Sequence, residues 1–166
     1  MENTNMCTYY FQDDGVIPNN HQLPLVLYPG VLHNDKDDMN EVFLKKDWHD
    51  TWIGGVFDYH HFHSTAHEVL GVLSGEATVQ FGGEHGKAVD IQAGDVVIIP
   101  AGVGHKRLHA TSEFRVVGAY PEGQWKDIRT GEHSERPIVL DNIKRVSLPK
   151  TDPVYGEEGR LLDVWS

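Results

Sequence analysis

Three histidines and one glutamate occur at spacings that could gather them around one metal ion. His61 and His63 are two residues apart, and in a strand such side chains share a face, with Cα atoms about 6.6 Å apart at about 3.3 Å per residue. The turn 64–67 lets the next strand fold back and offer the Glu68 carboxylate to the same point. His105 opens a remote strand and could supply the fourth ligand. Three neutral nitrogens and one carboxylate suit one divalent transition metal, which could be Fe, Mn, Ni, Co or Zn.

Two residues beyond His105 could act on a substrate held near such a metal. Counting by two along the strand places Arg107 and His109 on the same inward face as His105. Arg107 could clamp a carboxylate or phosphate through paired N–H donors, or it could pair with a buried acid or be turned to solvent by strand twist. His109 could serve as a general acid or base or as a hydrogen-bond donor to a ligand, or it could pack as an ordinary polar residue.

Tyr59, Tyr120 and His67 complete the set of candidate site residues. Tyr59 shares the face of the two neighbouring motif histidines, so it could line the site and move protons. Tyr120 ends a strand and could reach the mouth of the site as an acid or a hydrogen-bond donor, although packing is the commoner role there. Strand alternation turns His67 away from Glu68, which indicates a surface or interface histidine, unless the turn brings it inward as a metal ligand or as a hydrogen-bond donor to one.

Short strands separated by turn residues must position these side chains. Apolar or alternating runs occur over residues 51–63, 68–73, 77–81, 89–92, 96–99, 105–109 and 114–120. Strands at intervals of roughly 8–12 residues are typical of a sandwich or a barrel, so we predict an all-β fold.

The length of 166 residues fits one domain. We expect a single domain over 1–166, with a barrel core at about 51–120, an N-terminal arm at 1–50 and a C-terminal arm at 121–166. In the N-terminal arm, an acidic stretch leads into a loop or a short helix through residues 39–45. The C-terminal arm is polar and interrupted by prolines, and its apolar pieces are expected to cross the outside of the barrel.

The composition narrows the partners. Twenty-five acidic and 14 basic residues give a net charge of −11, which repels nucleic acid and anionic membranes and leaves a small-molecule ligand as the expected partner. That ligand could be anionic if local basic groups line its site. The single cysteine excludes an internal disulfide, and the N-terminus is polar with no long apolar run after it, so we expect a cytoplasmic protein.

Two segments resemble the motifs of the cupin family. The first motif, G-x5-H-x-H-x3,4-E-x6-G, is matched by Gly55, His61, His63, Glu68 and Gly75. The second, G-x5-P-x-G-x2-H-x3-N, is matched by Gly94, Pro100, Gly102 and His105, with His109 where asparagine is usual. The chain also resembles the YjlB-type single-domain cupins over 9–15, 63–75, 99–106, 120–124 and 152–156.

The resemblance implies a cupin double-stranded β-helix, a jelly-roll barrel with extended arms, and a metal on the four motif ligands. It leaves the reaction open, because cupins include dioxygenases, isomerases, epimerases, decarboxylases, storage proteins and sugar-sensing regulators. One interpretation is an enzyme for a small anionic organic substrate, with oxygenase-type or isomerase- or decarboxylase-type chemistry. The alternative is a non-catalytic, metal-dependent binder of a sugar or carboxylate. Cupins of this size often pair through outer strands, so a homodimer is expected.

Overall fold

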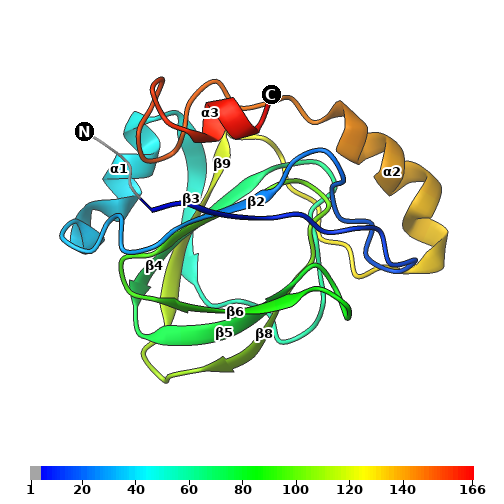
Figure 1. The fold of residues 1–166 in the computed structure, drawn as a ribbon, viewed down its shortest axis with the longest axis horizontal. Helices are drawn as coiled ribbons and strands as arrows, with labels where there is room; N and C mark the ends of the chain where they lie inside the picture. Colours follow the sequence, from blue (N-terminus) through cyan, green and yellow to red (C-terminus); the bar gives the residue numbers. More distant parts are fainter. Residues whose placement is uncertain (1–4) are drawn as a thin grey trace.

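Two antiparallel sheets form the fold, which the computed structural model describes over residues 5–166. The polar N-terminal residues 1–4, which entered the expectation of a cytoplasmic protein, lie outside this range. The larger sheet has the strand order β1 (Cys7–Tyr9), β2 (Leu25–Tyr28), β7 (Val96–Ile99), β4 (Glu68–Ser74), β9 (Arg115–Pro121) and β3 (Trp48–Gly54). The smaller sheet has the order β6 (Lys87–Gln92), β5 (Glu76–Phe81) and β8 (His105–Ala110). The two sheets face each other (Figure 1), and the predicted all-β class is confirmed.

Alternate residues of both sheets fill the space between them. Leu27 and Leu70 point inward from the larger sheet, and Val79, Phe81 and Ile91 point inward from the smaller one, all in one buried cluster. The inward residues of β4 and β9 are every second residue along each strand. This periodicity places the first residue of β4 on the inner face, at one end of the barrel.

The outer face of the larger sheet is covered by helices. Tyr28, Val69 and Ile98 belong to a second buried cluster, together with Met39 and Phe43. Met39 and Phe43 lie on α1 (Met39–Lys45). Of the two alternatives for this segment, a loop and a short helix, the structure has the helix. The C-terminal helix α3 (Leu161–Val164) covers the same face, as Figure 1 shows.

The remaining helices lie outside the sheets. They are the two 3-10 turns η1 (Lys36–Asp38) and η2 (His133–Glu135) and the helix α2 (Arg136–Arg145). Helix α2 lies beyond one end of the barrel in Figure 1, and its Val139 packs against Ile17 and Phe62. In the described part of the chain, every helix is too short or too polar to cross a membrane.

Two local expectations differ from the structure. The segment 51–63 was expected to be one strand, but β3 ends at Gly54, and extended pairing returns only at the isolated bridge between His61 and His105. Residues 55–60 form an irregular loop in between. The second difference concerns the segment that was expected to be an N-terminal arm outside the barrel core. Its residues 7–9 and 25–28 form β1 and β2 of the larger sheet, where β2 pairs with β7. The apolar run 25–28 suits this position, since it is buried on both faces.

Candidate metal centre

The four motif side chains converge at one end of the barrel. Glu68 is the first residue of β4 and points inward, and it is 2% exposed. The backbones of His61 and His105 exchange both N–H to carbonyl hydrogen bonds, at 3.2 and 2.9 Å, which places their rings side by side with centroids 4.0 Å apart. The carbonyl of His63 accepts the N–H of Gly102 at 2.8 Å, and this hydrogen bond anchors the backbone of His63. The three histidines are buried, like Glu68.

Backbone carbonyls orient all three imidazole rings. Each Nδ1 lies within hydrogen-bond distance of a carbonyl oxygen: Tyr59 for His61 (3.1 Å), Asp127 for His63 (2.5 Å) and Val103 for His105 (3.2 Å). A carbonyl can only accept, so each of these Nδ1 atoms carries a proton, and Nε2 presents its lone pair whenever the ring is neutral. Hydrogen bonding of the second ring nitrogen is the usual way in which proteins orient histidine ligands of metals.

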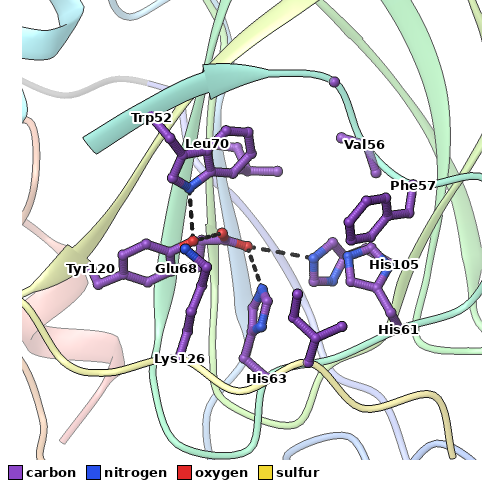
Figure 2. A pocket seen from close by; sticks show the side chains of 12 residues that line it. Trp52, Val56, Phe57, His61, His63, Glu68, Leu70, His105, Tyr120 and Lys126 are labelled. Carbon is purple, nitrogen blue, oxygen red and sulfur yellow. Dashed lines mark hydrogen bonds and ion pairs between the residues drawn. The ribbon is translucent and has the colours of Figure 1, made fainter. Parts of the chain in front are cut away.

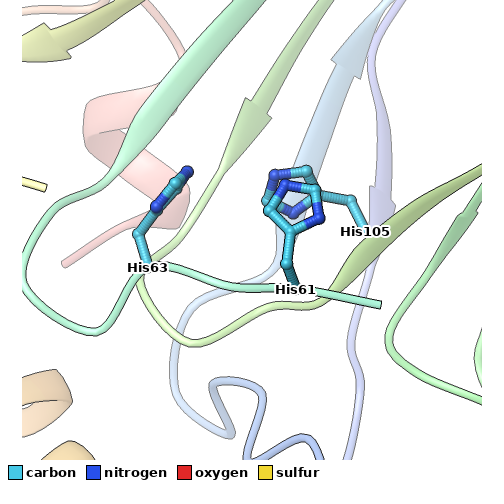
Figure 3. Close-up of side chains that lie close together, drawn as sticks. All are labelled: His61, His63 and His105. Atoms are coloured by element: carbon cyan, nitrogen blue, oxygen red, sulfur yellow. The ribbon is translucent and has the colours of Figure 1, made fainter. Parts of the chain in front are cut away.

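The free ring atoms point to a common space. One ring nitrogen from each histidine lies within 4.8 Å of the other two, as the close-up in Figure 3 illustrates. Glu68 Oε1 lies 3.3 Å from Nε2 of His63 and 3.4 Å from Nε2 of His105 (Figure 2). Three ring nitrogens therefore lie close together, and one carboxylate oxygen lies beside two of them, which is a donor set that could hold a divalent metal.

The charges of these groups depend on one another. Burial alone would raise the pKa of Glu68, but the nearby His63 and the hydrogen bond from His105 hold that pKa well below its usual range. Burial opposes protonation of His63, yet the Glu68 carboxylate raises the pKa of His63 overall. Burial, with His105 nearby, lowers the pKa of His61 to about 3. Glu68 is therefore anionic and His61 neutral near pH 7, which are the forms that bind metals.

Tyr120 holds the second oxygen of Glu68. Its hydroxyl donates to Glu68 Oε2 at 2.6 Å, and the indole N–H of Trp52 donates to the same hydroxyl at 2.8 Å. Burial and the adjacent carboxylate raise the pKa of Tyr120, so the phenol stays protonated. This chain of donors leaves Oε1 of Glu68 free to face the histidines, as Figure 2 shows.

A cavity of about 310 Å³ opens above these groups. Its walls are mainly apolar, and it is lined by Trp52, Gly55, Val56, Phe57, His61, His63, Glu68, Leu70, His105, Tyr120, Lys126 and Ile128 (Figure 2). Ligand pockets in proteins commonly begin at about 300 Å³, so a small organic molecule fits this space.

One wall of the cavity comes from the segment 124–129, which we call the strap. The strap runs antiparallel beside residues 61–67, which we call the motif loop. The backbones of Phe62 and Arg129 exchange two hydrogen bonds of 2.9 Å. Alternate strap residues then face opposite ways. Lys126 and Ile128 line the cavity, whereas Asp127 accepts hydrogen bonds from the loop on the other side.

Sequence reasoning missed the strap, because its contacts join residues about 60 apart in the chain. The available signal for an extended segment was the alternation over residues 125–129, with Lys126 and Ile128 on one face.

His109 does not share the inward face of His105, and that prediction is wrong. Thr78 of β5 pairs with His109, but the next residue of β5 pairs with Arg107, so β8 carries one extra residue, Leu108. Such a bulge reverses the alternation beyond it. His109 is therefore exposed on the outer surface, where it lies in a separate hollow with Thr78.

Arg107 also lies outside the cavity that contains the histidines. Its guanidinium contacts the carbonyl of Val56 at 3.4 Å and the carboxylate of Asp58 at 3.7 Å, and its side chain is 39% exposed. The irregular loop 55–60 supplies both partners and draws the side chain to the end of the barrel. Arg107 therefore does not line this cavity, and its charge partner is the exposed carboxylate of Asp58 rather than a buried acid.

Tyr59 and His67 hold positions beside the site. The Tyr59 ring is 43% exposed and stacks on Phe57 with centroids 5.0 Å apart, so Phe57 lines the cavity in its place. Tyr59 reaches the site through its carbonyl, which bonds the His61 ring. His67 is buried on the opposite side and is not the surface histidine that strand alternation indicated. Its Nδ1 accepts the N–H of Ala101 at 2.9 Å, in the turn that leads to His105. Burial lowers the pKa of His67 to about 3, so it is a neutral support of that turn.

Comparison with known proteins agrees with this architecture. The family profile described as "Cupin domain" matches residues 50–117, which run from β3 into β9. The chain is also 46% identical over 158 residues to the protein named "Uncharacterized protein YjlB" of Bacillus subtilis (strain 168), a match that covers 95% of each chain. This chain is a cupin of the YjlB type. The expected family and its double-stranded β-helix fold are thereby confirmed.

Solved structures resemble this cupin more distantly. Acireductone dioxygenase from Bacillus anthracis, with a cadmium ion in its active center, is 18% identical over 57% of this chain and 64% of that chain, with a TM-score of 0.38. A conserved protein with a double-stranded β-helix domain from Klebsiella pneumoniae is 18% identical over 70% of this chain and 76% of that chain, also with a TM-score of 0.38.

Proposed function

We propose that this cupin is a metal-dependent enzyme that acts on a small anionic organic substrate. Its metal ligands would be Nε2 of His61, His63 and His105 and the carboxylate of Glu68. The observation that carries the proposal is the convergence of these buried atoms beside a ligand-sized cavity, with every Nδ1 already engaged by a carbonyl. The donor set fits a divalent transition metal and leaves its identity among Fe, Mn, Ni, Co and Zn open.

The residues around the metal would each have a defined task. A bound metal would supply Lewis acidity and a template for substrate next to dioxygen or water, which suits oxygenase-type and isomerase- or decarboxylase-type chemistry. Tyr120 keeps Glu68 oriented and holds a proton at the edge of the cavity. Phe57 and Leu70 make apolar walls that exclude water from the substrate.

Metal content is the first test, and it requires protein without a polyhistidine tag. Elemental analysis of the purified, zinc-loaded chain should find one ion per chain. His61→Ala should weaken zinc binding by more than about 100-fold, beyond the cost of losing an outer hydrogen-bond partner. His109→Ala is the matched control, because this exposed motif histidine faces away from the site. Equal zinc affinity in wild type and His61→Ala would refute the proposed centre.

Turnover is the second test. Iron-loaded protein should consume oxygen with a member of a panel of small organic acids, or else convert one without oxygen, which proton NMR of the acid would detect. The His61→Ala variant should lose this conversion. A wild-type chain that binds acids but leaves the whole panel unchanged would support the non-catalytic alternative, a metal-dependent binder of small molecules.

We also propose that the chain is a single-domain cupin that works as a cytoplasmic homodimer. The exposed edge strand β3 supports pairing, since its Ile53 is 62% exposed and sheet edges are commonly covered by a second copy. Light scattering after size-exclusion chromatography should give twice the 18.7 kDa mass of the chain. A monomer across micromolar concentrations would contradict this part of the proposal.

A further inference from the structure

The cavity contains one cationic side chain with no assigned partner. Among the described residues that line it, Lys126 is the only lysine or arginine. Its ammonium lies 4.5 Å from the centroid of the Tyr120 ring, and within residues 5–166 it forms no ion pair with a carboxylate. Arg107, in contrast, is engaged by Asp58 outside the cavity. A cation at an apolar wall gains most from an anion that enters the same space.

Hydrogen bonds to Ser64 and Thr65 fix the strap backbone on both sides of Lys126. The Thr65 hydroxyl donates to the carbonyl of Trp125 at 2.6 Å and accepts the N–H of Asp127 at 3.0 Å. Asp127 in turn accepts the backbone N–H of Ser64 at 2.6 Å. The residues before and after Lys126 are therefore tied to the loop that carries the motif histidines, and Lys126 between them lines the cavity.

The walls define the rest of the ligand. Leu70, Phe57, Val56 and Ile128 present an apolar surface, and the cavity of about 310 Å³ corresponds to about ten water molecules at roughly 30 Å³ each. Recognition of a phosphate through paired hydrogen bonds is typical of arginine, whereas one ammonium is a compact point charge that can pair with a single carboxylate. A ligand that matches these walls would combine one carboxylate with a compact apolar body.

We propose that Lys126 is the anion-recognition residue of this cupin and that its ligand is a small monocarboxylate with an apolar body. This inference rests on the proposed function, since it assigns the substrate class of the same cavity. Lys126 of the strap would thus take the role of anion clamp, which was one of the alternatives considered for Arg107. The metal would hold the reacting end of the substrate, and Lys126 would select the acid over neutral molecules of the same shape.

Binding measurements can test this assignment without turnover. Butanoate and benzoate, with butanamide and benzamide as neutral isosteres, are titrated by calorimetry into zinc-loaded and metal-free protein. The acids should bind about 10-fold to 100-fold more tightly than the amides, as a hydrogen bond to a charged group predicts. Lys126→Met should reduce acid affinity to the level of the amides, and Lys126→Arg should retain most of it. Far-UV circular dichroism checks folding, and Lys126→Gln is the second variant if the methionine variant does not fold.

Lys87→Met is the matched control, because Lys87 also lies over a tyrosine ring, 5.9 Å from the centroid of Tyr9, but outside the cavity. It should bind the acids like the wild type. Unchanged acid affinity in Lys126→Met, equal affinity for acids and amides, or tighter binding of inorganic phosphate than of either acid would overturn the inference. Zinc content is measured on every sample. A wild type that holds no zinc would refute the metal centre, and the metal-free titration would still decide the role of Lys126.

Discussion

Replacing Tyr120 with phenylalanine removes one hydroxyl group that both Glu68 and Trp52 use. The hydroxyl donates to Glu68 Oε2 at 2.6 Å and accepts from Trp52 at 2.8 Å, and Tyr120 and Glu68 are 1% and 2% exposed. A hydrogen bond to a buried charge contributes about 1.5–3 kcal/mol. The Trp52 indole is only half-buried and can find water, so its loss adds little. We therefore expect Tyr120→Phe to lower the free energy of unfolding of the metal-free protein by about 2–3 kcal/mol.

The same substitution should weaken zinc binding by about 10-fold to 100-fold, because Glu68 loses the partner that orients it. Urea unfolding followed by circular dichroism gives the first quantity, and competition with a chelator gives the second. Tyr28→Phe is the control, since the buried Tyr28 hydroxyl donates to the buried carboxylate of Asp152, far from the metal ligands in the sequence and outside the cavity. It should lose stability without losing zinc. Wild-type zinc affinity in Tyr120→Phe would refute the view that Tyr120 orients Glu68.

Two further predictions concern the surroundings of the site. Burial alone would raise the pKa of Asp127, but hydrogen bonds, first from Ser64, lower it overall; its stabilising effect is therefore present above about pH 3.9 and is lost as the pH falls through the lower folded-state pKa. Asp127→Asn should then cost stability at neutral pH and little in strong acid, as unfolding across the pH range would measure. A Cβ at Gly118 would lie 2.3 Å from the indole of Trp52, so Gly118→Ala should displace that ring and shift its fluorescence. Gly55→Ala, with no atom within 4 Å of the new Cβ, should not.

The positions of His61, His63 and Glu68 were predictable because they depend on short-range spacing. His61 and His63 are two residues apart, Glu68 opens the next strand after a turn, and His105 follows a turn that ends in glycine. These local features survive changes elsewhere in the fold. The four side chains lie at one end of the barrel even though residues 55–60 are irregular, because the bridge between His61 and His105 restores extended backbone there. Metal binding by these side chains stays a prediction.

The surroundings of the ligands were less predictable, because they depend on register and on contacts between distant segments. Simple alternation cannot reveal the extra residue Leu108, and this bulge moves His109 to the outer surface. Arg107 was placed correctly on its strand, but the course of the loop 55–60 decides that its guanidinium pairs with Asp58. Likewise, nothing local to Lys126 indicates that its segment lies beside the motif loop.

The sources of these contacts suggest a division of labour within the cupin barrel. Two of the three ring orientations depend on carbonyls only two residues from their own histidine, Tyr59 for His61 and Val103 for His105. Substitutions of side chains elsewhere leave such contacts intact. The third ring is oriented by the carbonyl of Asp127, which belongs to the same strap that directs Lys126 into the cavity. A change in the strap that altered ligand preference would therefore also act on His63. Metal affinity and acid selectivity should vary together among strap variants that move the backbone. They should vary separately among variants that change only the Lys126 side chain.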